Sequence, residues 1–269
     1  MSDTSLPHVV PGEHPGRITK DLWLAGVLAV AFAVFYLLAQ SWTQELLVES
    51  TDMLFIAVSG VCCLLGLLVV RKWGFRGKFG VVHLGLFLYA FLWFAADIVW
   101  GIYEVFLHVD LPYPSVADLF YLAAYLPAFL GMGQFLWFFR KGFTPRKLAA
   151  AALSGLLIAC SSSAVLLYPL IFESADILTK LFDIGYPLLD TLLIVFGVMM
   201  AIAFGRGRFA NDWLWITLAL ILQGAADIAF SYGTLMGWYY SGHPIELLYL
   251  YGYLALGLGF AHQTRSLTQ

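Results

Sequence analysis

The sequence predicts an all-α integral membrane protein with eight transmembrane helices, and three observations carry this prediction. The chain of 269 residues is 61% hydrophobic and only 12% charged, whereas soluble domains average about 25% charged residues. Eight apolar stretches are long enough to cross a hydrocarbon core, which takes about 20 residues in helical form. The basic residues fall almost entirely in the connections on one side of these stretches.

The eight predicted spans are joined by short connections that leave no room for a soluble domain. They cover residues 22–40, 52–70, 79–107, 116–139, 148–172, 183–205, 213–238 and 245–262. The sixth span is the least regular, because Asp190 interrupts it. Residues 1–21 are polar and proline-containing, without a cleavable signal peptide, and predict a disordered tail. We therefore expect one membrane domain over 22–263 and a second short tail over 264–269.

The distribution of positive charge predicts the orientation. Thirteen of the 14 Lys and Arg residues lie on one side of the predicted spans, and only Lys180 lies on the other. The positive-inside rule places the basic side in the cytoplasm, so both termini are expected to be cytoplasmic in a multi-pass protein of the cell membrane. A basic face beside anionic lipid needs no nucleic-acid partner, and the lipid bilayer is the expected partner.

Seven carboxyl groups lie inside or at the edge of the predicted spans, without Lys or Arg beside them. They are Asp97, Glu104, Asp118, Asp183, Asp190, Asp227 and Glu246. A charged side chain in the bilayer costs roughly 2.5–3.5 kcal/mol on insertion scales, so such residues usually face a protein interior or a cavity. Each must be protonated, hydrogen-bonded to a neutral donor, solvated or bound to a cation. All seven lie in the outer half of their spans, which predicts a polar site that opens outward.

An internal repeat relates the two halves of the chain. The residues Ala-Ala-Asp-Ile at 95–98 recur at 225–228, an offset of 130. Residues 118–126 are echoed by 246–254, an offset of 128. We predict tandem helical hairpins forming two parallel four-helix repeats, related by an axis along the membrane normal. Chance similarity between apolar helices is the alternative.

A motif of oxygen-bearing side chains recurs in the even-numbered spans. An acid is followed by an aromatic residue after three positions and a polar residue after four more, as in Asp118, Tyr121 and Tyr125. These positions share one helical face, and a Tyr hydroxyl is a neutral donor for a membrane carboxylate. The predicted ligand-binding residues are Asp97, Asp118, Tyr121, Tyr125, Tyr186, Asp190, Asp227, Glu246 and Tyr249.

Capping and helix packing are the alternative explanation for part of this set. Acids at the outer starts of spans, such as Asp118, Asp183 and Glu246, interact favourably with the helix dipole. Polar contacts also join membrane helices without any ligand. The deeper Asp97 and Asp227, with Asp190, are harder to explain in this way and favour a functional site.

Other chemistry has weaker support in the sequence. His108, His243 and Glu104 are candidate metal ligands near the outer loops, but no HExxH or comparable spacing accompanies them. There is no Gly-rich phosphate loop, GxSxG elbow or kinase signature. We assign no catalytic residue, the cofactor is unknown, and an enzyme is the less favoured interpretation of the sequence.

The string Pro-Ser-Val-Ala-Asp-Leu-Phe-Tyr-Leu-Ala-Ala-Tyr at 114–125 resembles the PSxADxFYLxxY signature of a family of membrane modules. The Tyr-Pro-Leu-Leu-Asp string at 186–190 resembles the YPLxD element of the same family. These multi-helix modules stand ahead of diguanylate cyclase, PAS or histidine kinase domains in bacteria and archaea. The resemblance implies a sensory module, here without an output domain.

Three functional hypotheses follow. The first is a stand-alone sensor-like membrane protein that binds a small ligand, lipid or cation at the outward site and signals to a cytoplasmic or membrane partner. The second is a proton- or cation-coupled transporter, since internal repeats with membrane carboxylates are typical of such folds. The third is a metal-assisted intramembrane enzyme. The sequence leaves the ligand unidentified.

Overall fold

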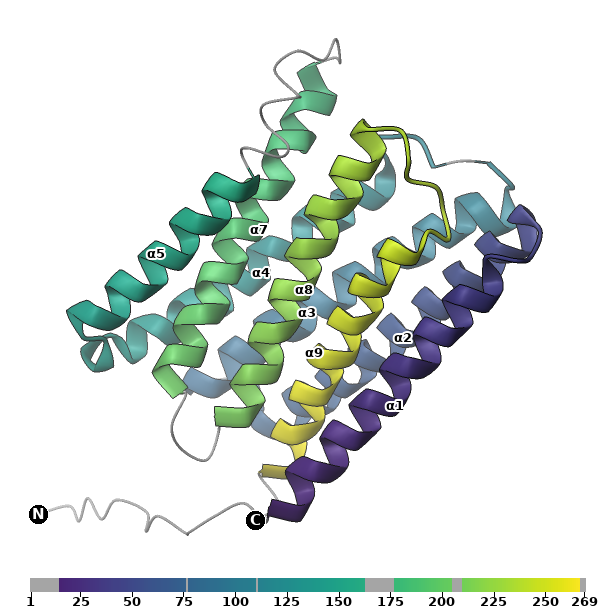
Figure 1. Ribbon diagram of the computed structural model, residues 1–269. Coiled ribbons are helices and arrows are strands. Elements are labelled where there is room, and N and C mark those ends of the chain that lie inside the picture. Colours follow the sequence, from purple (N-terminus) through teal and green to yellow (C-terminus); the bar gives the residue numbers. More distant parts are fainter. Residues whose placement is uncertain (1–14, 76, 110, 163–176, 205–209, 267–269) are drawn as a thin grey trace, which may run out of the picture.

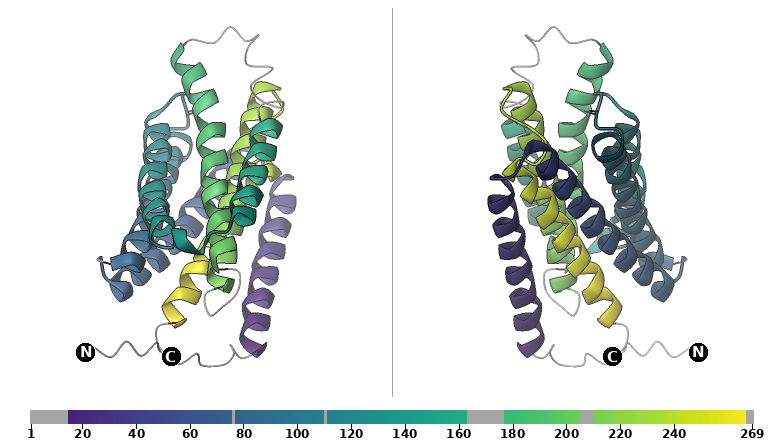
Figure 2. Two further views of the ribbon diagram at one scale, coloured as in Figure 1. Left: turned by 90° about the vertical axis from the view of Figure 1, so that its left-hand side faces the viewer. Right: turned by 90° about the vertical axis from the view of Figure 1, so that its right-hand side faces the viewer.

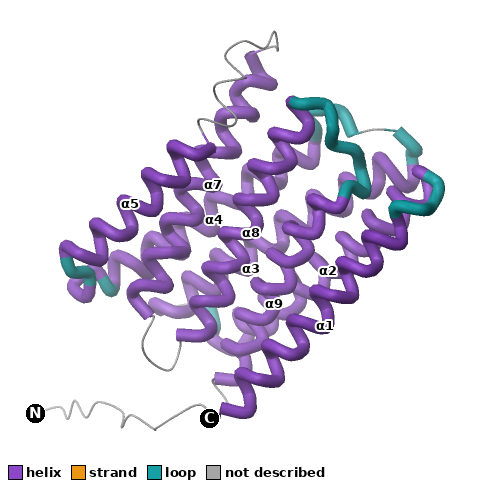
Figure 3. Tube along the Cα trace, viewed as in Figure 1, coloured by secondary structure: helices purple, strands orange, loops and turns teal. Residues whose placement is uncertain are grey.

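The computed structural model describes residues 15–75, 77–109, 111–162, 177–204 and 210–266. These ranges hold eight α-helices and no strand (Figure 3), which confirms the predicted all-α class. In chain order the helices are α1 Pro15–Ala39, α2 Gln44–Trp73, α3 Gly77–Gly101, α4 Val116–Phe138, α5 Pro145–Ser162, α7 Ile177–Phe204, α8 Ala210–Leu235 and α9 Leu247–Ser266. Three shorter turns, η1 Ile102–Phe106, η2 Arg140–Gly142 and η4 Pro244–Glu246, extend or connect them.

Seven of these helices are long and apolar enough to cross a membrane, which supports a multi-pass membrane protein. The exception within the described ranges is α5, which has 18 residues. The fifth predicted span covers residues 148–172, and its second part, residues 163–172, lies outside the described residues. The helix α1 begins at Pro15, inside the segment that we predicted as a tail.

The helices run side by side in one bundle, with α1 and α5 at opposite edges (Figures 1 and 2). Helix α3 packs along α4, and α8 packs along α9, which gives the two predicted hairpins. Helix α2 lies against α3 and α9, while α7 lies against α8 and α4. In the repeat, α2, α3 and α9 correspond to α7, α8 and α4, so α2 and α7 have equivalent neighbours. The edge helices differ, because α1 packs on α9 and α5 packs on α7.

A pair of glycines brings α3 and α4 together. A Cβ atom at Gly85 would lie 2.4 Å from the carbonyl oxygen of Pro127, and one at Gly131 would lie 3.1 Å from the Cα of Gly85. Small residues allow membrane helices to approach closely and gain van der Waals contact where lipid offers no hydrophobic driving force. This contact fixes the hairpin that positions Asp97 opposite α4.

The bundle has two chemically distinct ends. We call the end with the α1–α2, α3–α4 and α8–α9 connections the acidic end, and the end where α1 begins and α9 finishes the basic end (Figure 1). Asp21 near the start of α1 contacts Arg265 near the end of α9. The first helix therefore begins, and the last helix ends, on the same side of the bundle. The helix directions place Arg71 and Arg140 at the basic end as well.

Two of the predicted span starts were wrong, and this changes the explanation of two acids. Helix α2 begins at Gln44 and α7 at Ile177, so Asp52 and Asp183 lie inside helices rather than at their first turns. The reason is that both helices continue beyond their most apolar stretch; α2 is capped by the Thr43 side chain, which accepts the N–H of Leu46. Dipole capping therefore does not account for Asp52 and Asp183.

Candidate functional site

A cavity of about 830 Å³ lies between the helices at the acidic end. Its lining includes exposed residues such as Glu45 and His108, so the cavity reaches the molecular surface. Nine of the described lining residues are acids, and none is Lys or Arg. The nine acids are Glu45, Glu49, Asp52, Asp97, Glu104, Asp118, Asp183, Asp227 and Glu246. The bundle thus gathers nine carboxyl groups from different helices and connections around one cavity at its acidic end.

Asp97 is buried and held by tyrosines from two helices. The Tyr121 hydroxyl on α4 donates to one carboxyl oxygen at 2.9 Å, and the Tyr253 hydroxyl on α9 donates to the other at 2.7 Å. The Ser59 hydroxyl of α2 also lies beside Asp97. Each donor is neutral, so these contacts satisfy the carboxyl oxygens without supplying a positive charge.

Asp227 of α8 has the corresponding arrangement in the second half. Tyr249, the repeat partner of Tyr121, donates to Asp227 at 2.7 Å. Tyr125, the repeat partner of Tyr253, lies beside Asp227 but donates its hydroxyl to Asp190 at 2.5 Å. Each deep acid thus has one tyrosine from its own hairpin and one from the other hairpin beside it. This reciprocity extends the sequence repeat to the side chains of the site.

The acids at the helix starts have both a structural and a cavity-lining role. Asp118 accepts the Ser115 N–H at 2.6 Å in a capping box, and its other oxygen accepts the Tyr186 hydroxyl at 2.8 Å. Glu246 accepts the Gly242 N–H at 2.9 Å. Capping explains part of the role of these two acids, as predicted, but both still line the cavity.

Glu246 also connects the cavity to α1. One of its oxygens accepts the Tyr36 hydroxyl from α1 at 2.9 Å, and the other accepts the Tyr239 hydroxyl at 2.8 Å. Burial and the Glu246 charge raise the pKa of Tyr239 well above its usual range, so this hydroxyl stays a proton donor. Similarly, burial and Asp183 raise the pKa of Tyr113, whose hydroxyl donates to Asp183 at 2.7 Å.

Two predicted ligand-binding residues lie behind the cavity wall rather than in it. Asp190 is 1% exposed, and its Oδ1 accepts the Tyr125 hydroxyl at 2.5 Å. Neither residue is part of the cavity lining. The reason is that Asp190 is one helical step deeper than Tyr186 on α7 and faces Asp227 on α8. The other seven predicted ligand-binding residues all line the cavity.

The three candidate metal ligands do not lie in one cluster. Among the described residues, the one compact group of potential ligand atoms is Glu45, Glu49 and His108, with all atoms within 4.8 Å of one another at the cavity mouth. His243 instead uses Nδ1 to accept the Ile245 N–H at 3.1 Å. Burial lowers the pKa of His243, which favours this neutral capping form.

Glu104, the third candidate, lies in the π-helical turn η1 that follows α3. It accepts the Ser241 hydroxyl at 2.8 Å and lies close to Asp52. Such π-helical turns are frequent at functional sites, because they rotate one side chain out of the regular helical register. Here the turn directs Glu104 into the cavity.

Sequence reasoning missed several residues that complete the site. Tyr36, Tyr113 and Tyr239 donate to cavity acids from α1 and from two connections. The ring of Trp93 lies 4.7 Å from that of Tyr121 and forms an aromatic wall of the cavity. No local signal marked these residues, because their roles depend on which helices are neighbours.

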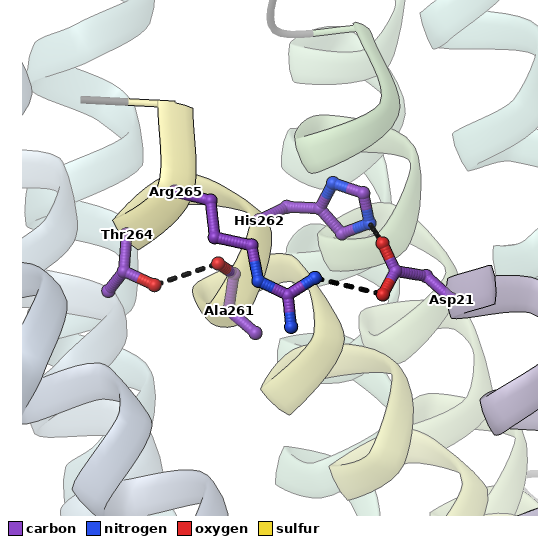
Figure 4. Close-up of polar contacts among 5 residues, drawn as sticks. All are labelled: Asp21, Ala261, His262, Thr264 and Arg265. Atoms are coloured by element: carbon purple, nitrogen blue, oxygen red, sulfur yellow. Dashed lines mark hydrogen bonds and ion pairs between the residues drawn. The ribbon is translucent and has the colours of Figure 1, made fainter. Parts of the chain in front are cut away.

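A separate polar cluster at the basic end joins α1 to α9 (Figure 4). Asp21 accepts from Nη1 of Arg265 at 2.9 Å, and its other oxygen lies 2.9 Å from Nε2 of His262. Asp21 is buried, whereas the Arg265 side chain is 56% exposed. At the other end of α1, Tyr36 donates to Glu246 in the turn η4 that leads into α9. Polar contacts therefore join α1 to α9 and its preceding turn at both ends of the bundle.

Comparison with models of known protein families, with curated proteins and with solved structures finds no match.

Proposed function

We propose that this chain is a sensor-like multi-pass membrane protein that binds a small organic cation in the acidic cavity. The observation that carries the proposal is the charge of the lining, with nine acids and neither Lys nor Arg among the described lining residues. Clefts of one charge sign with low-dielectric walls concentrate ions of the opposite sign. By the positive-inside rule, the acidic end would face outward.

The tyrosines explain why such a site is stable before a ligand arrives. Each deep acid accepts phenol hydroxyls, as Asp97 does from Tyr121 and Tyr253. These hydrogen bonds reduce the cost of burying the acid but leave its negative charge uncompensated. A cation that enters from the acidic end gains attraction to several acids without having to displace a protein cation.

The size and walls of the cavity favour an organic cation over a single metal ion. A volume of about 830 Å³ lies within the roughly 300–1,000 Å³ of sites that hold drug-sized molecules. The rings of Phe55 and Trp93 lie 6.2 and 6.0 Å from that of Tyr249, so aromatic faces adjoin the deep acids. Ammonium groups bind both carboxylates and aromatic faces, gaining about 0.5–2 kcal/mol from the ring.

A path for a signal runs through Glu246 and α1. Glu246 lines the cavity and holds Tyr36 of α1 at 2.9 Å. A cation bound to Glu246 would compete with that hydrogen bond and alter how α1 packs on α9. Helix α1 begins at the opposite end of the bundle, close to Asp21, where a cytoplasmic partner could detect the change. The resemblance to sensory modules supports this role.

A proton-coupled carrier is the second candidate, and the contact between Asp190 and Asp227 favours it. Uptake of labelled spermidine into proteoliposomes separates the two functions. A sensor predicts binding without uptake, whereas a carrier predicts uptake driven by a proton gradient.

The proposal is tested by thermal unfolding of the purified protein with spermidine, choline, calcium or glutamate. The organic cations should raise the unfolding temperature, and glutamate should not. Asp97→Asn and Asp227→Asn should each reduce the shift. Asp21→Asn, which neutralises an acid at the basic end, should retain it. Equal shifts for all four compounds, or for calcium alone, would contradict an organic-cation site.

A further inference from the structure

Asp190 and Asp227 form a contact between two carboxyl groups just below the cavity. Asp190 lies on α7 and Asp227 on the neighbouring α8, and their side chains lie close enough to interact. The helices approach closely here, because a Cβ atom at Gly224 would lie 3.3 Å from the Cβ of Asp190. Only Asp227 belongs to the cavity lining. Asp190 therefore touches the site through Asp227.

Hydrogen-bond donors contact only two of the four carboxyl oxygens of the pair. Oδ1 of Asp190 accepts the Tyr125 hydroxyl at 2.5 Å, and Oδ1 of Asp227 accepts the Tyr249 hydroxyl at 2.7 Å. The two Oδ2 atoms are buried, and neither accepts a hydrogen bond from an N–H or O–H group of the described residues. Ionised carboxylates are acceptors only, so a hydrogen bond between two carboxyl groups requires a proton on one of them.

No described basic group faces the pair. Helix α3 contributes Tyr89, α4 contributes Tyr125, and α9 contributes Tyr249. On α7 itself, Tyr186 lies one turn toward the acidic end. All of these groups are neutral phenols. Two like charges in this setting would repel each other with no positive charge among the named groups to offset the repulsion.

The first half of the chain provides an internal control for the pair. Ser59 of α2 occupies the position that corresponds to Asp190, and Asp97 corresponds to Asp227. Ser59 lies beside Asp97, and its hydroxyl donates to the Phe55 carbonyl at 2.8 Å. The equivalent helix pair in the first half, α2 and α3, therefore packs with a hydroxyl in place of the second acid. Packing of these two helices alone does not require an acid at the position of Asp190.

We propose that Asp190 and Asp227 hold one proton between them, and that a cation bound against the cavity side of Asp227 releases this proton into the cavity. The cation brings one positive charge to Asp227 as the proton carries one away, so the charge of the pair and its occupant stays constant. The shared proton stands on the geometry of the pair. Its release also rests on the proposed cation binding.

The shared proton is tested by infrared difference spectroscopy of the purified protein without any ligand, at neutral pH. The difference between wild type and Asp190→Asn should contain the carbonyl band of a protonated carboxyl group. The amide of Asn can donate to Asp227 and makes the proton unnecessary. Asp21→Asn, far from the pair, should give no such band. An Asp190→Asn difference spectrum without the band overturns the proposal.

Ser59→Asp gives the converse test, because it would build a second carboxyl pair with Asp97. A correctly folded Ser59→Asp protein should gain a second protonated carboxyl band, in addition to the band of the Asp190 and Asp227 pair that wild type already has. A folded variant without that gain counts against the reasoning. If this variant does not fold, the Asp190→Asn spectrum decides alone.

Proton release is measured by titrating spermidine calorimetrically in buffers with different ionisation enthalpies. Wild type should release about one proton per spermidine, and Asp190→Ser, which copies the first half, should release about none. Binding without release in wild type overturns the coupling. Absence of binding by any cation would instead refute the proposed function and leave the infrared result standing.

Discussion

The hydrogen bond from Tyr36 to Glu246 should be the strongest single polar contact between α1 and the rest of the bundle. Tyr36 is fully buried, and its hydroxyl is 2.9 Å from Oε2 of Glu246. The other two donors to this carboxyl, Tyr239 and Gly242, both bind Oε1. Tyr36→Phe therefore leaves Oε2 without its donor while the rest of the contact persists.

The magnitude follows from the charge of the acceptor. A hydrogen bond to a charged group contributes roughly 1.5–3 kcal/mol, and water in the cavity can partly replace the lost donor. We therefore expect Tyr36→Phe to lower the free energy of unfolding by about 1.5–2 kcal/mol. The assay is denaturant unfolding in mixed micelles, with helix content followed by circular dichroism.

Tyr251→Phe is the matched control, because it also removes a tyrosine hydroxyl between α9 and α1. Tyr251 donates to the neutral carbonyl of Ala29 at 3.2 Å and is only partly buried. Its loss should cost about 0.5–1 kcal/mol, in the range of a neutral hydrogen bond. Equal effects of the two substitutions would refute the idea that a charged Glu246 anchors α1.

Three further predictions concern packing, the basic end and pH. Gly85→Ala should destabilise the protein by about 1–3 kcal/mol or prevent folding, because the new methyl group meets the α4 backbone; Gly26→Ala, with open space around it, should be neutral or stabilising in the same unfolding assay. Asp21→Asn should cost about 1 kcal/mol, since the Arg265 side chain is 56% exposed, and hydrogen exchange should increase in the first turns of α1; unchanged exchange there would count against the role of the cluster. Burial lowers the pKa of His243, so the unfolded chain binds that proton more readily and the free energy of unfolding should rise as pH increases through about 6.5; His243→Asn should flatten this rise, and an identical pH profile would contradict it.

The helical bundle was predictable because apolar segments of this length leave few alternatives in a bilayer. Backbone groups must be satisfied within the segment, which makes each span a helix. The alternating sides of the charged connections then gave the direction of each helix. The offset of 130 residues also predicted that Asp97 and Asp227 would have equivalent surroundings.

The partners of the acids were only partly predictable. The spacing of Asp118, Tyr121 and Tyr125 placed them on one side of α4, but spacing does not show which helix that side meets. In the structure each residue meets a different partner: Tyr186 of α7 for Asp118, Asp97 of α3 for Tyr121, and Asp190 of α7 for Tyr125. Helix order around a bundle is set by contacts between distant segments, which a local pattern does not encode.

Asp190 of α7 and Asp227 of α8 also show what a local sequence pattern does not predict. Asp190 and Asp227 both looked like cavity residues, because both interrupt apolar spans. Their depth along the helices was clear from the sequence, but their rotation was not. Asp227 lies in the cavity wall, and Asp190 lies behind it and beside Asp227.

The most direct test of the acidic cavity is equilibrium binding of radiolabelled spermidine to the purified protein in nanodiscs. Wild type should show saturable binding that choline competes for and glutamate does not. The double variant Asp97→Asn with Asp227→Asn should lose that binding, because the carboxyl groups between the two hairpins supply the charge. Binding of the same strength in the double variant, or none in wild type, would contradict the account.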